Sequence, residues 1–193
     1  VSSMILRMTW NRNYGTFDRD AVFIRTQFES GGTTQNFIDP HDVTNEDLQF
    51  FKYLRVNFDF RKLHVISKWA TLAYRINSGI AYSYDKNPAL PYEKFYFAGG
   101  SNSVRAWRPR RLGLGSVPPI RSSDATEEGL FDYKFEKPGE ILLEGSVELR
   151  GKLVGFIDGA VFIDAGNVWG FRKPNAETEG NSQFKAKTSL KEM

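Results

Sequence analysis

The 193-residue sequence contains no cysteine and only two histidines. The lack of cysteine excludes a disulfide scaffold and cysteine-based metal sites. The histidines, His41 and His64, lie far apart without a ligand-spaced companion, so we expect no metal site. Long apolar runs are also missing. No segment approaches the roughly 18 residues of a transmembrane helix, although the strands of a membrane barrel need only about 10 alternating residues.

The patterns of common catalytic sites are absent as well. Ser146 lies in a strand-like segment without the sharp turn that exposes a nucleophilic serine. The acids that resemble catalytic pairs, Asp158 with Asp164 and Glu144 with Glu148, are typical of a polar strand face. We therefore expect neither an enzyme nor a cofactor. The net charge of +3 gives no support for nucleic acid as a partner.

Apolar and polar residues alternate with a period of two along most of the chain. In the clearest segment, Leu54, Val56, Phe58 and Phe60 alternate with charged or amide side chains. Such alternation predicts β-strands with one apolar and one polar face. The pattern recurs in residues 4–10, 21–29, 53–61, 68–82, 142–150 and 155–166.

The length of these runs bears on the fold class. Several extend over about 10 to 15 residues, whereas strands of globular proteins average about 5 to 6. We predict short turns at residues 61–64 and 151–154, and long connections at 31–48, 84–139 and 167–183. Long strands, an aromatic-rich apolar face, and short turns opposite long loops favour an outer-membrane β-barrel. A soluble β-sandwich remains the alternative.

The longest connection, residues 84–139, contains an unusual stretch, "GGSNSVRAWRPRRLGLG". It combines four arginines with Trp107 and several glycines between strand-like segments. A structureless connection of more than fifty residues is usually functional or disordered. Glycine would allow close backbone approach and arginine would allow pairing with carboxylates, but these residues alone favour a solvated extracellular loop.

Three motifs in this order resemble the BamA/TamA family of outer-membrane barrel assembly factors, also called bacterial surface antigens. "FYFAGGSNSVRAWRPRRLGLG" is similar to that family's inward-folded sixth loop, with its motif at Val104, Arg105, Ala106 and Trp107. "LLEGSVELRGKL" and "GAVFIDAGNVW" are similar to the next two strands, with a Phe-x-Asp-x-Gly motif. The match covers about residues 45–193. Ala106 and Leu114 depart from the family's usual glycine and proline.

The resemblance implies an all-β fold, namely part of an antiparallel transmembrane β-barrel that has sixteen strands in the family. We expect residues 1–193 to form a partial barrel domain with six strands and the start of a seventh. Residues 84–139 are expected to form a long loop folded into the lumen. The family's N-terminal POTRA domains and its final strands have no counterpart in the sequence, so we expect a fragment of a larger protein.

The resemblance also assigns a structural latch. It implies that Arg105 pairs with Asp164 inside the lumen, with Glu148 as a second acceptor and Glu144 on the same face. A guanidinium is suited to bidentate pairing with a carboxylate. Other expected members of the latch are the loop-motif residues Gly99, Gly100, Val104, Ala106, Trp107, Gly113 and Gly115, and the strand-motif residues Phe162 and Gly166.

The function that the resemblance implies is assembly of client proteins into the outer membrane of a Gram-negative bacterium. The implied partners are the lipid bilayer, client outer-membrane proteins, and periplasmic or lipoprotein accessory subunits, with no nucleic acid. Three alternatives stay open: a two-partner secretion pore, a barrel fused to a patatin-like phospholipase, and a soluble β-sandwich binding module.

Overall fold

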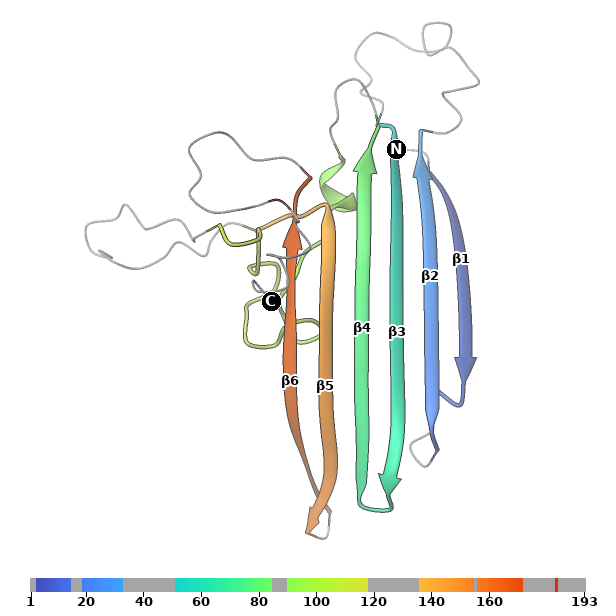
Figure 1. Cartoon of the computed structure of the whole chain (residues 1–193), viewed down its shortest axis with the longest axis vertical. Helices are drawn as coiled ribbons and strands as arrows, with labels where there is room; N and C mark the ends of the chain where they lie inside the picture. Colours follow the sequence, from blue (N-terminus) through green and yellow to red (C-terminus); the bar gives the residue numbers. More distant parts are fainter. Residues whose placement is uncertain are drawn as a thin grey trace, which may run out of the picture.

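The computed structural model shows a single antiparallel sheet of six strands in sequential order (Figure 1). It describes residues 3–14, 19–32, 51–84, 90–117, 136–154, 156–171 and 183. The strands are β1 (Ser3–Arg12), β2 (Ala21–Gly31), β3 (Tyr53–Ser67), β4 (Ala70–Ser83), β5 (Ile141–Val154) and β6 (Ile157–Trp169). The all-β class is confirmed. The sheet is open, as expected for part of a barrel.

One face of the sheet, which we call the outer face, is apolar and uncovered in the described residues. Met4 on β1 and Val161 and Ile163 on β6 keep 70%, 74% and 74% of their surface exposed. A β-sandwich would bury this face against a second sheet. The exposed apolar face therefore contradicts the β-sandwich alternative and agrees with a barrel wall that faces lipid.

The predicted turns are displaced, because the strands are longer than expected. Residues 61–64 lie inside β3, whose pairing with β4 continues to Ser67 opposite Ala70. Residues 151–154 belong to the end of β5, where a register shift lies between Lys152 and Val154. The arginine and lysine side chains at these positions belong to paired strands. The polarity of these residues is therefore not a sign of a turn.

The predicted connection at 167–183 also begins too early. β6 continues to Trp169, which pairs with Ile141 on β5. Asn167 and Trp169 are buried, with 2% and 0% of their surface exposed. The predicted start of a seventh strand lies outside the described residues, as does most of the connection at 31–48.

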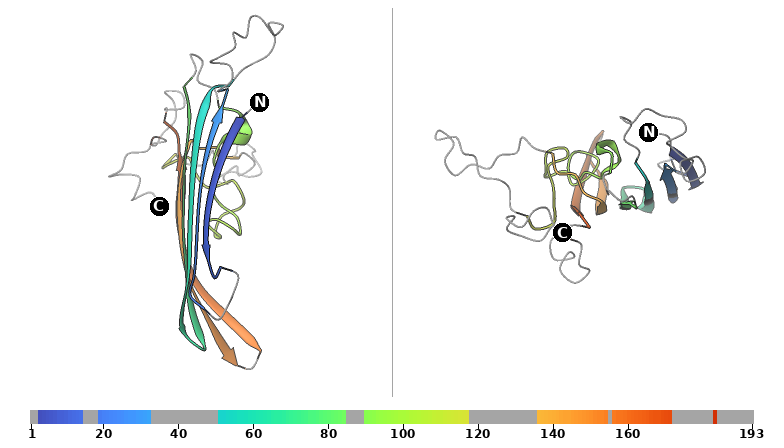
Figure 2. Two further views of the ribbon diagram at one scale, coloured as in Figure 1. Left: turned by 90° about the vertical axis from the view of Figure 1, so that its right-hand side faces the viewer. Right: turned by 90° about the horizontal axis from the view of Figure 1, so that it is seen from above.

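The described parts of the long connection between β4 and β5 lie along one face of the sheet, which we call the inner face (Figures 1 and 2). These parts are residues 84, 90–117 and 136–140, with a short 3-10 helix, η3 (Tyr92–Lys94). The described residues contain no helix that is long and apolar enough to cross a membrane.

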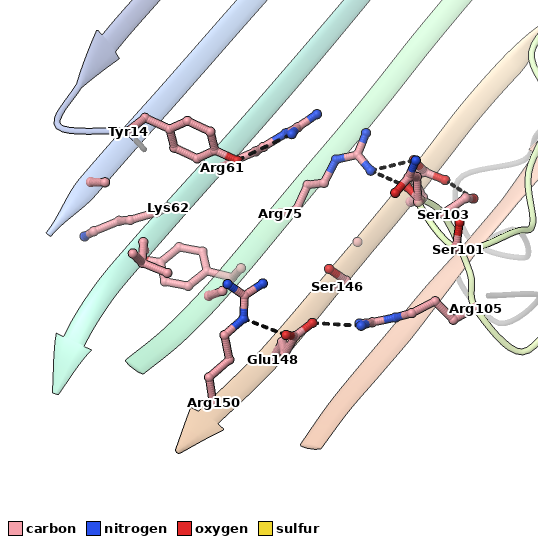
Figure 3. A pocket seen from close by; sticks show the side chains of 17 residues that line it. Tyr14, Arg61, Lys62, Arg75, Ser101, Ser103, Arg105, Ser146, Glu148 and Arg150 are labelled. Carbon is pink, nitrogen blue, oxygen red and sulfur yellow. Dashed lines mark hydrogen bonds and ion pairs between the residues drawn. The ribbon is translucent and has the colours of Figure 1, made fainter. Parts of the chain in front are cut away.

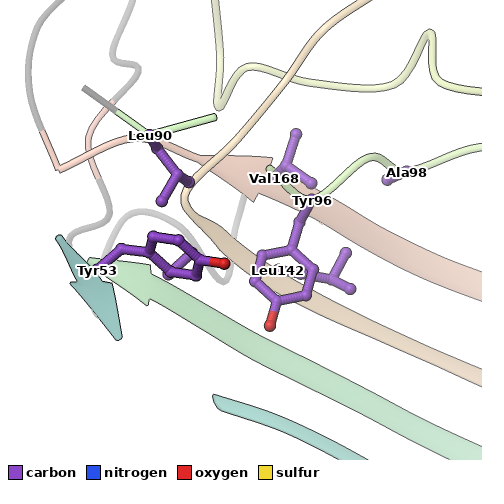
Figure 4. Packing of buried hydrophobic residues seen from close by; sticks show 7 residues of the cluster. Tyr53, Leu90, Tyr96, Ala98, Leu142 and Val168 are labelled. Atoms are coloured by element: carbon purple, nitrogen blue, oxygen red, sulfur yellow. The ribbon is translucent and has the colours of Figure 1, made fainter. Parts of the chain in front are cut away.

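The apolar core lies between this loop and the inner face near one end of the sheet (Figure 4). Tyr53 on β3, Leu142 on β5 and Val168 on β6 pack against loop residues Tyr96 and Ala98. Tyr53, Ala98 and Val168 are completely buried. The inner face is thus stabilised by apolar contact with the loop, whereas the middle of the face carries charged side chains.

Candidate functional site

The part of the loop that carries the arginine motif, which we call the loop tip (residues 99–111), is a compact series of turns. The Gly100 amide donates to the Trp107 carbonyl at 2.9 Å, and the Trp107 amide donates to the Val104 carbonyl at 3.1 Å. The predicted glycines all adopt left-handed backbone conformations, with φ values of 98° at Gly99, 101° at Gly100, 123° at Gly113 and 56° at Gly115.

A side chain at Gly99 would meet two obstacles. Its φ of 98° is rarely adopted by other residues. A Cβ atom there would also overlap the backbone carbonyl oxygen of Arg108. Gly99 therefore allows the chain to reverse so that Val104 and Arg105 point at the sheet.

Arg105 reaches two carboxylates on neighbouring strands. Its Nε donates to Asp164 Oδ2 at 2.7 Å and its Nη2 to Asp164 Oδ1 at 2.8 Å, a bidentate pair with β6. Its Nη1 donates to Glu148 Oε2 on β5 at 2.7 Å. The Arg105 backbone amide adds a bond to Asp164 Oδ2 at 3.2 Å. The structure thus brings together Arg105, Asp164 and Glu148.

Two further groups surround this ion pair. The guanidinium carbon of Arg105 lies 3.5 Å from the centroid of the Phe162 ring on β6, a cation–π geometry. Arg150 Nε donates to the other oxygen of Glu148 at 2.6 Å. The hydrogen bonds from Arg105 to Asp164 and then Glu148 raise the pKa of Arg105 above its usual value, so the charge is retained.

Glu144 contacts a different residue of the loop tip. Its Oε2 accepts a hydrogen bond from the Ser103 hydroxyl, and its Oε1 accepts one from Asn77 Nδ2 on β4 at 2.9 Å. Gly166 lies beside it on β6, where an added Cβ would come within 2.7 Å of Glu144 Cβ. Glu144 therefore binds the loop through Ser103, a residue that the sequence analysis did not single out.

The remaining residues of the loop motif divide between buried and exposed positions. Val104 is buried, whereas Ala106 and Trp107 are exposed. The Cβ of Ala106, where the family has glycine, is accommodated because the position faces outward. Arg110 extends away from the latch and pairs with Glu136 at 3.3 Å while stacking on Phe97.

A cavity of about 560 Å³ lies between the loop tip and the inner face of the sheet (Figure 3). Charged side chains from β3, β4 and β5 surround it, including Arg61, Arg75, Arg150 and Glu148. Arg61 and Arg75 both bind Asp59, at 2.6 Å and 3.2 Å. In the described part of the chain, no three metal-ligating side chains cluster together. The site is a network of ion pairs between a loop and a strand wall.

Sequence reasoning missed a second group of loop contacts. Lys94 in η3 pairs with the buried Glu29 on β2, with Nζ 2.7 Å from Oε1. The Tyr96 hydroxyl donates to the Val56 carbonyl at 2.8 Å. Tyr96 lies within the stretch that resembles the family's loop, but the resemblance assigned no partner to it, and 65 positions separate Glu29 from Lys94. The alternation of β2 did place Glu29 on the polar face, which was the only available signal.

The comparison with known families agrees with this architecture. A sequence model of the Omp85 superfamily domain matches residues 3–190, which is nearly the whole chain. No curated protein matches the sequence significantly. The motif-bearing loop, its carboxylate partners on β5 and β6, and the family match over the full sheet lead to one conclusion: the chain belongs to the Omp85 superfamily.

Proposed function

We propose that this chain is the barrel portion of a BamA- or TamA-like factor that helps client proteins fold into the outer membrane without enzymatic chemistry. The Omp85 superfamily comprises outer-membrane proteins that insert or transport proteins. The observation that carries the finer proposal is the three-point binding of Arg105 to Asp164 and Glu148. The proposed partners are the lipid bilayer, unfolded client barrels and periplasmic accessory subunits.

The exposed apolar face supports the lipid bilayer as a partner. Met4, Leu6, Met8 and Trp10 all lie on one face of β1 and keep more than half of their surface exposed, at 70%, 59%, 54% and 52%. Their neighbours across β2 include Phe28 and Ile24. A continuous band of this kind suits hydrocarbon. Charged side chains on the same face, Arg12 on β1 and Lys62 on β3, lie opposite Val22 near one end of the strands.

In this proposal the Arg105 ion pair acts as a latch that fixes the loop tip on β5 and β6. Asp164 is almost buried, with 5% of its side chain exposed, whereas Arg105 retains 26%. Removal of Arg105 leaves the Asp164 carboxylate without its partner, at a cost of about 2–3 kcal/mol. This value is below the roughly 3–5 kcal/mol of a fully buried pair, because water reaches Arg105.

A charge exchange tests the function in cells that depend on a plasmid copy of the protein. We expect Arg105→Glu and Asp164→Arg each to lower the amount of folded client barrels in the outer membrane. The double variant should restore part of it, because the two charges then attract again. Additive defects would refute the latch, and unchanged client levels in all three variants would refute the insertion role.

A second assay separates insertion from secretion. If the protein were a two-partner secretion pore, the variants would reduce export of a soluble substrate while client barrels inserted normally. We expect the opposite result. The matched control is Arg110→Glu, which changes an arginine of the same loop that binds Glu136 rather than the strand wall.

A further inference from the structure

We infer that the loop is held by a second anchor, formed by its first segment on β2, β3 and β4, and that this anchor retains the loop when the Arg105 latch is open. We call residues 90–98 the loop stem. The inference deepens the latch part of the proposed function and does not depend on the client-insertion activity. It makes Lys94 and Tyr96 positioning residues for the loop tip.

The first component of the second anchor is a buried ion pair. Lys94 Nζ lies 2.7 Å from Glu29 Oε1, and the Glu29 side chain is only 2% exposed. The Tyr53 hydroxyl donates to the same oxygen at 2.8 Å, and Arg55 Nη1 lies 3.7 Å from the other oxygen. The hydrogen bond to Glu29 raises the pKa of Lys94. Because Glu29 is buried, loss of Lys94 would remove its closest cation.

The second component is the insertion of an aromatic ring into a notch. Tyr96 lies over Gly79 on β4, where any Cβ atom would overlap the Tyr96 ring. The Arg55 guanidinium covers the ring with its carbon 4.3 Å from the centroid. The hydroxyl of Tyr96 donates to the Val56 carbonyl on β3 at 2.8 Å. Only 4% of Tyr96 is exposed, so its side chain is buried like that of a core residue.

The stem is also paired with the returning part of the loop. The Tyr96 amide and carbonyl exchange hydrogen bonds with Gly139, both at 2.8 Å, and the Leu112 amide donates to the Ala98 carbonyl at 3.3 Å. Leu90 and Ala98 are buried against Tyr53 and Leu142. These contacts bury apolar surface that the Arg105 latch does not touch.

The two anchors use different side chains of the sheet, although apolar contacts of the stem reach Leu142 on β5 and Val168 on β6, and Arg75 on β4 donates to the Asn102 carbonyl of the loop tip. The stem contacts β2, β3 and β4 through Glu29, Val56 and Gly79, whereas the tip contacts β5 and β6 through Glu148 and Asp164. Figure 4 shows Tyr96 between Tyr53 and Leu142 in the cluster that surrounds the stem. No residue of one anchor is a partner of the other in these contacts. Opening the latch therefore leaves the stem contacts intact, and the loop bridges five strands.

Labelling of a single cysteine tests the inference in the intact protein in cells. The sequence has no cysteine, so Ser101→Cys, at an exposed position of the loop tip, gives one reactive thiol. The reagent is a polyethylene-glycol maleimide added outside the cells. We expect Arg105→Met or Lys94→Met alone to raise the labelling rate far less than the double variant does, because the remaining anchor still holds the loop. The double variant should raise it about tenfold or more, since about 1.4 kcal/mol of lost anchoring is tenfold in a conformational equilibrium.

Charge-matched variants complete the test. Lys94→Arg should behave as the wild type, and exchange of charges in Lys94→Glu with Glu29→Lys should restore slow labelling in the Arg105→Met background. Lys68→Met, in the turn between β3 and β4, is the control for loss of a lysine. The barrel's resistance to unfolding by detergent without heating confirms folding, and Lys94→Gln replaces Lys94→Met if that variant fails this check.

The inference is overturned if Arg105→Met alone is labelled as fast as the double variant. It is also overturned if Lys94→Met adds nothing in the Arg105→Met background. The labelling rate reports the position of the loop and not client insertion. If the variants were labelled as expected while client insertion stayed unaltered, the proposed function would be refuted and the second anchor would stand.

Discussion

The Arg105 guanidinium on the loop tip lies over the Phe162 ring of β6, with the guanidinium carbon 3.5 Å from the ring centroid. The same guanidinium forms a bidentate pair with Asp164, two residues further along β6. Side chains two residues apart share one face of a strand. The Phe-x-Asp spacing therefore places a π face and a carboxylate beside one cation, which explains why the strand motif contains both residues.

The aromatic ring should contribute measurably to loop binding. Phe162→Leu keeps apolar volume but removes the π face, so we expect a loss of about 1–2 kcal/mol, whereas Phe162→Tyr should be nearly neutral. A double-mutant cycle with Arg105→Met, measured by the heat needed to unfold the barrel in detergent, isolates the coupling. Additive effects of the two substitutions would show that Phe162 acts only by filling space.

The notch at Gly79 gives a second prediction, which concerns volume rather than charge. Gly79→Ala places a methyl group where the Tyr96 ring lies, so the stem must shift and its apolar contacts are lost. We expect a destabilisation of about 1–3 kcal/mol, typical of overpacking. Gly145→Ala on neighbouring β5 is the matched control, since the nearest atom to an added Cβ there is 3.6 Å away.

A compensating substitution makes this prediction specific. Tyr96→Leu shortens the side chain in the notch, so it should reduce the cost of Gly79→Ala in the double variant. Thermal unfolding of the four proteins measures this coupling. An equal cost of Gly79→Ala with either residue at position 96 would exclude the proposed steric contact.

These two cases show how far the sequence allowed prediction. The period of two was sufficient to predict that the strands exist and to identify the polar face on which Glu29, Glu144 and Asp164 lie. The motif resemblance indicated that Arg105 and Asp164 pair. Nothing local marked Gly79 or Lys94, because their importance comes from residues far away in the chain. The polar face of the strand was enough to select Glu144 as a candidate, but its contact with Ser103 depends on the fold of the loop tip.

The errors have a common physical origin. A turn was predicted at residues 61–64, yet Arg61 lies within β3, paired with Arg75 on β4, and its guanidinium binds Asp59 two residues earlier on the same face. A strand that lines a polar lumen contains charges throughout its length, so charge does not mark its end. Strand ends are instead fixed by register, as at Ser67 opposite Ala70.

The stem anchor should weaken in alkali. The pKa of Tyr96 is raised by burial from 10.0 to about 12, and the pKa of Lys94 is raised by its hydrogen bond to Glu29. Both folded-state pKa values lie above the unfolded ones. Their contribution to stability is therefore complete below about pH 10 and is lost as the pH rises through the folded-state values. The charged groups that face Lys94 and Tyr96 are Glu29 and Arg55. The titratable hydroxyl of Tyr53 also faces this site, through its bond to Glu29.

The expected result is a fall in the unfolding temperature of the barrel between about pH 10 and pH 12. Tyr96→Phe removes one titrating group and should flatten this fall, although it lowers stability at neutral pH through loss of the bond to Val56. Tyr82→Phe, on the outer face, controls for loss of a tyrosine. Identical pH profiles for the wild type and Tyr96→Phe would contradict the assignment.

The last prediction concerns the edge of β6 opposite β5, where, among the described residues, the loop takes the place of a neighbouring strand. The Gly115 amide donates to the Val168 carbonyl at 2.7 Å, the Val168 amide donates to Asn167 Oδ1 at 2.8 Å, and Asn167 Nδ2 donates to the Gly115 carbonyl at 3.0 Å. These bonds satisfy backbone groups that an adjacent strand would otherwise pair. A strand that pairs with this edge of β6 should therefore pair only with residues that precede Asn167.

Asn167→Ala removes both side-chain bonds, so hydrogen–deuterium exchange should accelerate in residues 113–117 and 166–170. Asn167→Asp keeps the acceptor for the Val168 amide but places a carboxylate oxygen against the Gly115 carbonyl. Exchange should then accelerate at 113–117 while the Val168 amide stays protected, because only the bond to Gly115 is lost. If exchange at Val168 accelerated equally in both variants, Asn167 would not be the acceptor that closes this edge.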